Sequence, residues 1–223
     1  MTISILTLFP DMFRGPFDFS IIKRAQTPKN LLSLNLINIR DFANDNYGTV
    51  DDRPYGGGVG MIMRVDVIDR ALKRVKSQFK GLSNTYTILL DTRGVTYTQA
   101  LARKFCDFDH LILVCGHYEG VDYRVNKLVD SVISIGDYVL TGGEIPALVL
   151  VDSITRLLPG VLSKASATTD ESFTNQSLEY PQFTRPETYK NMTVPAVLRS
   201  GDPRQISIWK KVEAQRLTKA KKL

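Results

Sequence analysis

Cysteines and long apolar stretches are both scarce in this 223-residue sequence. The only two cysteines, Cys106 and Cys115, have a spacing that suits neither a disulfide framework nor a zinc site, so we predict no metal centre. No apolar run approaches the ~20 residues that span a bilayer. The first residues also lack the basic leader and cleavage site of a secretory signal. We therefore expect a cytoplasmic protein with reduced thiols and no membrane partner.

Two common nucleotide-binding motifs are also missing. The chain contains neither G-x-G-x-x-G nor G-x-x-x-x-G-K-[ST], which argues against an ordinary dinucleotide fold and against a P-loop. Net positive charge is scarce outside the last part of the chain, because acidic residues balance most of the basic ones there. The net charge is +6, and residues 201–223 hold seven basic and two acidic side chains. A basic segment suits an anionic partner such as RNA or DNA, although a solvated lysine-rich tail fits equally well.

What is present is an alternation of apolar runs and amphipathic stretches. We predict strands at residues 3–9, 32–39, 86–90, 111–115 and 132–135. Between them, apolar residues recur at helical spacing over 65–79, and shorter helices are predicted at 98–105 and 122–129. Strands that alternate with helices form βαβ units, so the sequence predicts an α/β fold with a mostly parallel sheet covered on both faces.

The composition changes after residue 161. Residues 162–178 are rich in Ser, Thr and Asp and poor in apolar side chains, which is typical of a linker or a functional loop. The rest of the chain contains four prolines and ends in an amphipathic helix predicted at 204–217. We therefore predict an α/β domain at 1–161, a flexible linker at 162–178 and a small basic helical domain at 179–223.

Glycine-bearing loops follow three of the predicted strands. They are "DTRG" (91–94), "CGHYEG" (115–120) and "IGDYVLTGG" (135–143). Open α/β sheets bind ligands outside the carboxyl ends of their strands, and glycine lets the backbone approach a ligand closely. Turn formation alone would explain any one loop. Three such loops together predict one pocket, whose peptide groups would suit an adenine, a ribose or a phosphate.

Several other residues could carry chemistry. The glycine cluster "DDRPYGGGVGM" (51–61) is either a solvated hairpin tip or a loop that approaches a base edge. His110 opens an apolar strand and is predicted to be structural, whereas His117 lies in the second glycine loop. No Asp or Ser stands near His117 in the sequence, so a nucleophilic triad is not favoured. Arg156 follows late in a helix and needs an anionic partner, either a ligand or a surface carboxylate.

The helix that follows Gly143 has conflicting start signals. Thr141 and Glu144 have the spacing of a capping box. Pro146 suits the first helical position, which would move the start of the helix to residues 145–146. Under either reading, Glu144 is expected to be a helix-start residue rather than a catalyst.

Four motifs together carry a resemblance to a known family. In order, they are "DDRPYGGGVGM", "CGHYEGVD", "IGDYVLTGGEIPA" and "YPQFTRP". The chain resembles the bacterial tRNA (guanine-N1)-methyltransferases of the SPOUT class, from residue 2 to about residue 217. The resemblance implies a trefoil knot in the C-terminal part of the α/β domain, a helical C-terminal domain that binds tRNA, and a homodimer with the active site at the subunit interface. It also implies S-adenosylmethionine-dependent methyl transfer to N1 of guanosine 37, beside the anticodon.

The resemblance also implies roles for single residues. Arg156 matches the arginine that would stabilise charge on guanine O6, and the general base would be an acid before Ser-Phe, where this chain has Asp170 and Glu171. Three further segments depart from the family pattern: His117 replaces a common arginine, "DTRG" replaces Ser-Pro-Gln-Gly, and "SGDPRQISIW" differs from the usual Gly-Asn-His or Gly-His-His. A relative acting on another RNA and a non-catalytic RNA-binding relative are the alternatives. The implied cofactor-binding residues are Leu90, Gly116, Tyr118, Glu119, Ile135, Gly136, Asp137, Tyr138, Val139, Leu140, Gly142, Gly143 and Pro146.

Overall fold

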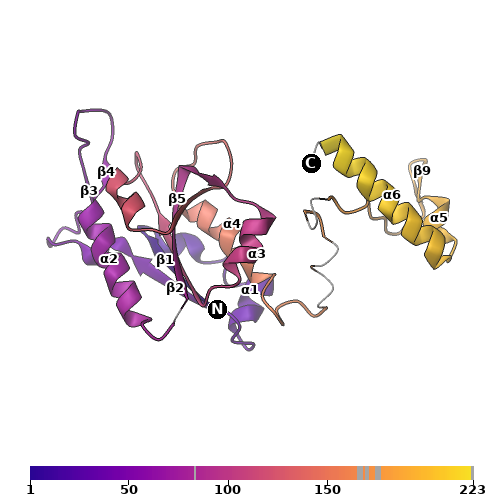
Figure 1. Ribbon diagram of the computed structural model, residues 1–223, viewed down its shortest axis with the longest axis horizontal. Helices are drawn as coiled ribbons and strands as arrows, with labels where there is room; N and C mark the ends of the chain where they lie inside the picture. The colour runs from indigo at the N-terminus through magenta and orange to yellow at the C-terminus, as the bar shows by residue number, and fades with distance from the viewer. Residues whose placement is uncertain (83, 165–167, 169–170, 174–176, 222–223) are drawn as a thin grey trace. The chain divides into compact units, whose positions relative to one another are not determined.

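The chain divides into two units, Met1–Ser163 and Lys164–Leu223, in a computed structural model (Figure 1). The structure describes residues 1–223 apart from 83, 165–167, 169–170, 174–176 and 222–223. Asp170, one of the two residues predicted as the general base, lies outside the described residues.

The first unit is built on a five-stranded sheet with the order β2-β1-β6-β5-β7. Its strands are β1 (Thr2–Thr7), β2 (Ser33–Asn38), β5 (Thr85–Thr96), β6 (His110–Cys115) and β7 (Ser131–Ser134). Every neighbouring pair in this sheet is parallel. All six residues of the central strand β6 are buried, because both faces of a parallel sheet are covered. The predicted α/β fold with a mostly parallel sheet is therefore confirmed.

Helices cover the two faces of this sheet (Figure 1). On one face lie α1 (Ser20–Gln26), α3 (Gln99–Phe105) and α4 (Glu144–Thr155), and on the other lies α2 (Val65–Gln78). Successive side chains of β6 alternate between the two resulting cores. Leu111 and Leu113 pack with the α4 side, whereas Ile112 and Val114 pack with α2.

Two predicted boundaries in this unit were wrong. The strand predicted at 86–90 continues as β5 to Thr96, with an irregular register opposite β7 between Leu90 and Val95. Gly94 permits this continuation, since a Cβ there would lie 2.5 Å from the backbone nitrogen of Ile133. The helix predicted at 122–129 is only a 3-10 turn, η3 (Tyr123–Lys127), in which the Asp122 side chain accepts the N–H of Arg124.

Neither of the two conflicting start signals before α4 gives its observed start, although Glu144 is a helix-start residue as expected. The N-cap residue is Gly143, which has no side chain to cap the helix, and α4 begins at Glu144. Pro146 is the third residue of the helix, where its missing N–H costs nothing because the first N–H groups of a helix lack partners within it. Glu144 instead turns its carboxylate into the core, and the side chain is 1% exposed.

Short elements complete the first unit. They are η1 (Pro10–Phe13), η2 (Ile39–Phe42) and the two-residue strands β3 (Asp51–Asp52) and β4 (Ile62–Met63). The glycine-rich segment 53–61 connects β3 to its antiparallel partner β4. The end of this segment contacts the second glycine loop: the N–H of Glu119 donates to the carbonyl of Met61 at 3.1 Å.

The second unit contains little buried apolar surface. Its elements are β8 (Thr188–Tyr189), β9 (Met192–Thr193), α5 (Ala196–Arg199) and α6 (Pro203–Lys221). The helix predicted at 204–217 corresponds to α6, which is longer at both ends. At its start, Asp202 Oδ1 accepts a hydrogen bond from the N–H of Arg204. Residues that precede the hairpin fold along α6: the N–H of Leu178 donates to Thr218 Oγ1 at 2.9 Å. Among the described helices of both units, none is long and apolar enough to cross a membrane.

Candidate functional site

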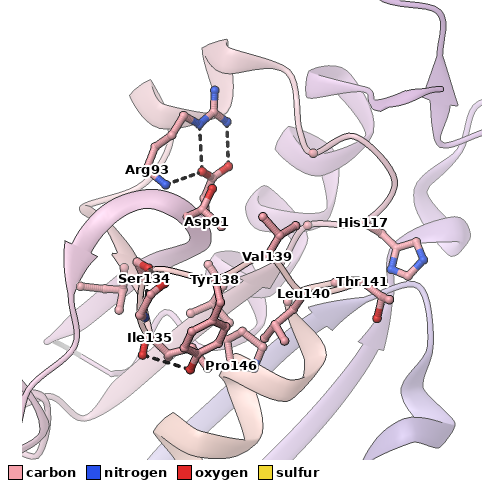
Figure 2. A pocket seen from close by; sticks show the side chains of 18 of the residues that line it. Asp91, Arg93, His117, Ser134, Ile135, Tyr138, Val139, Leu140, Thr141 and Pro146 are labelled. Carbon is pink, nitrogen blue, oxygen red and sulfur yellow. Dashed lines mark hydrogen bonds and ion pairs between the residues drawn. The ribbon is translucent and has the colours of Figure 1, made fainter. Parts of the chain in front are cut away.

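A pocket lies at the carboxyl ends of β6 and β7, and the middle of β5 forms a third wall (Figure 2). Its walls come from residues 90–93, 116–120, 133–136, 138–143 and 146, which include parts of all three glycine-bearing segments named in the sequence analysis. The segment "DTRG" lies within β5, so the prediction of a loop there was wrong. Parallel strands end at one edge of the sheet, so loops far apart in the sequence meet there. Twelve of the thirteen residues expected around a cofactor line this pocket. The exception is Asp137, whose side chain is exposed and does not line it.

The third loop is held against the second by backbone contacts. The N–H of Gly143 donates to the carbonyl of Gly116 at 2.8 Å, and His117 forms an antiparallel bridge with Gly142. A Cβ at Gly143 would lie 2.6 Å from the Cα of Cys115. The two segments can therefore approach this closely only because residue 143 has no side chain.

The wall contributed by residues 134–138 presents peptide groups that are fixed locally. Ser134 Oγ exchanges hydrogen bonds with the backbone of Gly136, at 3.1 Å to its carbonyl and 3.2 Å from its N–H. The phenol of Tyr138 folds back and donates to the carbonyl of Ile135 at 3.2 Å (Figure 2). A preformed turn of this kind reduces the entropy lost when a ligand binds.

An ion pair occupies the wall formed by β5. Arg93 donates two side-chain hydrogen bonds to the carboxylate of Asp91, at 2.8 and 2.7 Å (Figure 2). These bonds lower the pKa of Asp91, because they favour its charged form. The guanidinium also lies 5.7 Å from the ring centre of Tyr123. Asp91 and Arg93 both belong to the segment "DTRG", but their pairing with each other was not predicted.

His117 lines the pocket, and the buried Glu144 lies behind it, beside Gly142. Oε1 of Glu144 accepts a hydrogen bond from Thr7 Oγ1 at 2.8 Å, while Oε2 lies 3.8 Å from Nδ1 of His117. The His117 ring packs on Phe9 with 4.7 Å between ring centres. This acidic partner could not be predicted, because Glu144 is the first residue of α4 and Thr7 lies in β1. A contact between residues so distant in the chain cannot be read from local spacing.

Two buried groups near the sheet have no catalytic character. Burial lowers the pKa of His110 to about 4, and its Nε2 lies 2.8 Å from Ser4 Oγ. This arrangement agrees with the structural role predicted for His110. Burial, and secondarily the nearby Glu144, raises the pKa of Cys115 well above its usual range. The thiol is therefore neutral and unreactive.

The expected catalytic residues belong to different parts of the chain. Arg156 is the C-cap residue of α4 in the first unit, and Glu171 belongs to the second unit. Near Glu171, the N–H of Glu179 donates to Ser172 Oγ at 3.0 Å. The structure thus gathers the predicted pocket residues, whereas the roles of Arg156, Glu171 and Asp170 stay predictions.

A parallel α/β sheet with a glycine-lined pocket at its carboxyl edge defines the class of enzymes that bind nucleotide-like ligands at the ends of parallel strands. The model of the family described as tRNA (Guanine-1)-methyltransferase TrmD matches residues 1–223. The chain therefore belongs to the tRNA (guanine-1)-methyltransferase family.

Curated relatives named tRNA (guanine-N(1)-)-methyltransferase agree with this assignment. The protein of Carboxydothermus hydrogenoformans is 48% identical over 215 residues, which cover 96% of this chain and 83% of that protein. The relative from Pelotomaculum thermopropionicum is 50% identical over 212 residues, covering 95% and 84%. The relative from Caldanaerobacter subterraneus is 46% identical over 222 residues, covering 100% and 90%.

Proposed function

We propose that this chain transfers a methyl group from S-adenosylmethionine to N1 of guanosine 37 in tRNA. The observation that carries the proposal is the pocket, where three glycine-bearing segments converge beside the sheet. The chain also belongs to a family of tRNA methyltransferases. We further propose that the enzyme acts in the cytoplasm. The basic helix α6, which carries Lys210, Lys211 and Arg216, is proposed to contact tRNA phosphates.

The lining of the pocket fits an adenosine-containing methyl donor. Apolar side chains of Leu90, Ile133, Ile135, Leu140 and Pro146 offer surfaces for a flat aromatic base. Carbonyl and N–H groups of the neighbouring glycine loops can meet its polar edge. The sulfonium of the donor supplies an activated methyl group. The chain then has mainly to hold N1, the methyl carbon and sulfur in line, and such alignment is a large catalytic contribution.

Proton removal from N1 is the step that needs side-chain chemistry. N1 of guanine carries a proton, so its lone pair is unavailable until a base accepts that proton. We assign this role to Glu171 or Asp170. Negative charge then develops on O6, where the guanidinium of Arg156 would stabilise it. A relative that modifies another RNA would use the same pocket, so the RNA substrate has to be tested directly.

We also infer that the C-terminal part of the first unit forms a trefoil knot. Support comes from two close approaches between segments of different strands. Residue 94 of β5 lies against the backbone of Ile133, and Gly143 lies against Cys115 and Gly116 after the chain has left β7. Knots are rare in proteins. Such tight backbone passages at glycines are the contacts that a knotted crossing would require.

A homodimer is proposed from an exposed apolar surface on the first unit. Ile145 and Val149 are 44% and 41% exposed and lie one helical turn apart on α4. The turn η1 packs against α4 and adds Met12, which is 42% exposed, with Phe9 beside it. A contiguous patch of large apolar side chains is typical of a protein interface. Since α4 also borders the pocket, a partner seated here would lie next to the active site.

The substitution Val149→Asp is expected to convert this dimer into a monomer. A carboxylate buried at an interface without a partner costs several kcal/mol. Light scattering after size-exclusion chromatography measures the mass directly. Val212→Asp is the matched control, because Val212 is an exposed valine on α6 and is 54% exposed. A monomeric wild-type protein, or a dimeric Val149→Asp variant, would contradict the proposed interface.

The function is tested by methyl transfer from labelled S-adenosylmethionine to an unmodified tRNA. We expect incorporation with guanosine at position 37 and none when adenosine replaces it. Equal labelling of both RNAs would indicate a different target nucleotide. Binding of S-adenosylhomocysteine without any methyl transfer would indicate a non-catalytic RNA-binding relative.

A further inference from the structure

We propose that His117 and Glu144 form a charge pair that clamps two loops of the pocket together and makes cofactor binding depend on pH. The inference rests on the proposed function, because the affected ligand is the adenosine-containing methyl donor. His117 belongs to the loop 116–120, and Glu144 immediately follows the loop 135–143. Both residues would act as positioning residues, through the walls of the pocket.

The carboxylate of Glu144 is buried and has one described hydrogen-bond donor, Thr7. The side chain is 1% exposed, and Thr7 provides a hydrogen bond to only one oxygen, Oε1. Thr7 Oγ1 in turn accepts the N–H of Phe9 at 2.9 Å, so this hydroxyl is fully engaged. A buried carboxylate is costly unless it is paired and hydrogen-bonded. Glu144 therefore needs a cation near Oε2.

His117 is placed to supply that cation. Its Nδ1 lies 3.8 Å from Oε2, and this nitrogen is buried without a hydrogen-bond partner among the described residues. A donor left unpaired in this way is costly as well. A movement of about 1 Å would turn the ion pair into a charge-assisted hydrogen bond. The imidazole of His117 can thus supply a positive charge to Glu144, and the carboxylate of Glu144 can supply a hydrogen-bond partner to Nδ1 of His117.

Gly142 lies directly between the two side chains. A Cβ at this position would lie 2.3 Å from Oε2 of Glu144 and 2.6 Å from Nδ1 of His117. The backbone of Gly142 also bridges to His117 in antiparallel fashion. The pair and the backbone bridge together fasten the end of the loop 135–143 to the loop 116–120. Weakening the pair should loosen the wall that faces the ligand.

Few other titratable groups surround this pair. The His117 ring contacts Phe9 and the edge of Tyr118, 5.1 Å away between ring centres. Cys115 of β6 lies near Glu144, and burial keeps its thiol neutral. Among the described residues that pack against the imidazole, Glu144 is therefore the acidic group that faces it. The charge of the pair changes when the histidine loses its proton.

The direction of the effect follows from this charge change. Histidine side chains ordinarily lose their proton between about pH 5 and 8. When the imidazole is protonated, it compensates Glu144 and the clamp is closed. As the pH rises, the positive charge is lost and a buried carboxylate remains without a cation. Binding of the donor, which needs both loops in place, should weaken with rising pH.

The test is calorimetric binding of S-adenosylhomocysteine to the full chain from about pH 5.5 to pH 8.5. We expect the dissociation constant of the wild type to rise about fivefold or more, a typical coupling between two binding events. His117→Arg keeps its charge throughout, so its dissociation constant should change less than about twofold. His117→Gln and Glu144→Gln should both lose the pH dependence, and His117→Gln should bind weakly at every pH.

Wild-type affinity that does not change with pH would overturn the inference, as would a His117→Arg variant with the wild-type pH dependence. Absence of binding at every pH would overturn the proposed function instead. A second readout covers variants that fold poorly. The chain has only two histidines, so proton NMR of the wild type can follow the His117 ring directly. A ring signal whose shift is unaffected by Glu144→Gln would contradict the pair.

Discussion

Neutralising the linker acid that we propose as the base is expected to slow single-turnover methyl transfer by about 10²–10⁴-fold. The two substitutions are Glu171→Gln and Asp170→Asn, tested separately on tRNA with guanosine at position 37. Each replaces a carboxylate by an amide of the same shape, which cannot accept the N1 proton. The variant with the larger loss identifies the base. Single-turnover conditions isolate the chemical step from product release.

Glu179→Gln is the control for this prediction. Glu179 is another acid of the same unit, and its backbone N–H already bonds to Ser172. Its replacement is expected to leave the rate within about twofold of the wild type, because the amide keeps the oxygen that accepts the hydrogen bond from Gln182. If neither Glu171→Gln nor Asp170→Asn lowers the rate at least about tenfold, a linker carboxylate is not the base. Arg156→Ala should lower the same rate about 10²-fold by removing charge stabilisation at O6.

The sheet could be predicted from sequence because its strands are buried on both faces. Continuous apolar runs result, such as residues 111–115, and these mark a strand without any knowledge of its neighbours. The end of β5 could not be predicted in this way. Residues 91–96 are mostly polar, and they continue the strand only because Gly94 allows a close approach to β7. That approach is a tertiary contact with no local signal.

The candidate site was predictable for a related reason. Carboxyl ends of parallel strands share one edge, so the glycine loops after β6 and β7 meet there, although "DTRG" lies within β5 instead of after it. What could not be predicted was the pairing inside the site. Thr141 and Glu144 have the local spacing of a capping box, yet Glu144 bonds instead to Thr7, which lies 137 positions away. A buried hydrogen bond outweighs a cap of about 1 kcal/mol, so the local signal failed.

The substitution Gly143→Ala is expected to disrupt the pocket more than any other single added methyl group in its walls. The new Cβ would lie 2.6 Å from the Cα of Cys115 and 3.0 Å from the nitrogen of Gly116. These are backbone atoms of a buried central strand and its continuation, so they cannot move aside as a flexible side chain would. The third loop must shift instead, and the hydrogen bond from Gly143 to the Gly116 carbonyl is lost.

Both stability and binding should respond to this change. Overpacking of a closely packed site costs about 1–3 kcal/mol, so we expect a melting temperature several degrees lower. S-adenosylhomocysteine should bind at least about tenfold more weakly, because misplaced binding groups lose most of their contribution. Thermal unfolding followed by circular dichroism and calorimetric titration measure the two effects.

Gly81→Ala separates the steric effect from the general effect of replacing glycine. A Cβ at Gly81 meets no atom within 4 Å, and this residue does not line the pocket. Its substitution should change stability by no more than about 0.5 kcal/mol and leave ligand binding intact. If Gly143→Ala bound and melted like Gly81→Ala, the close passage of the third loop beside β6 would not be what shapes the site. A loss confined to Gly143→Ala would show that the glycine at this junction is required by the backbone of β6.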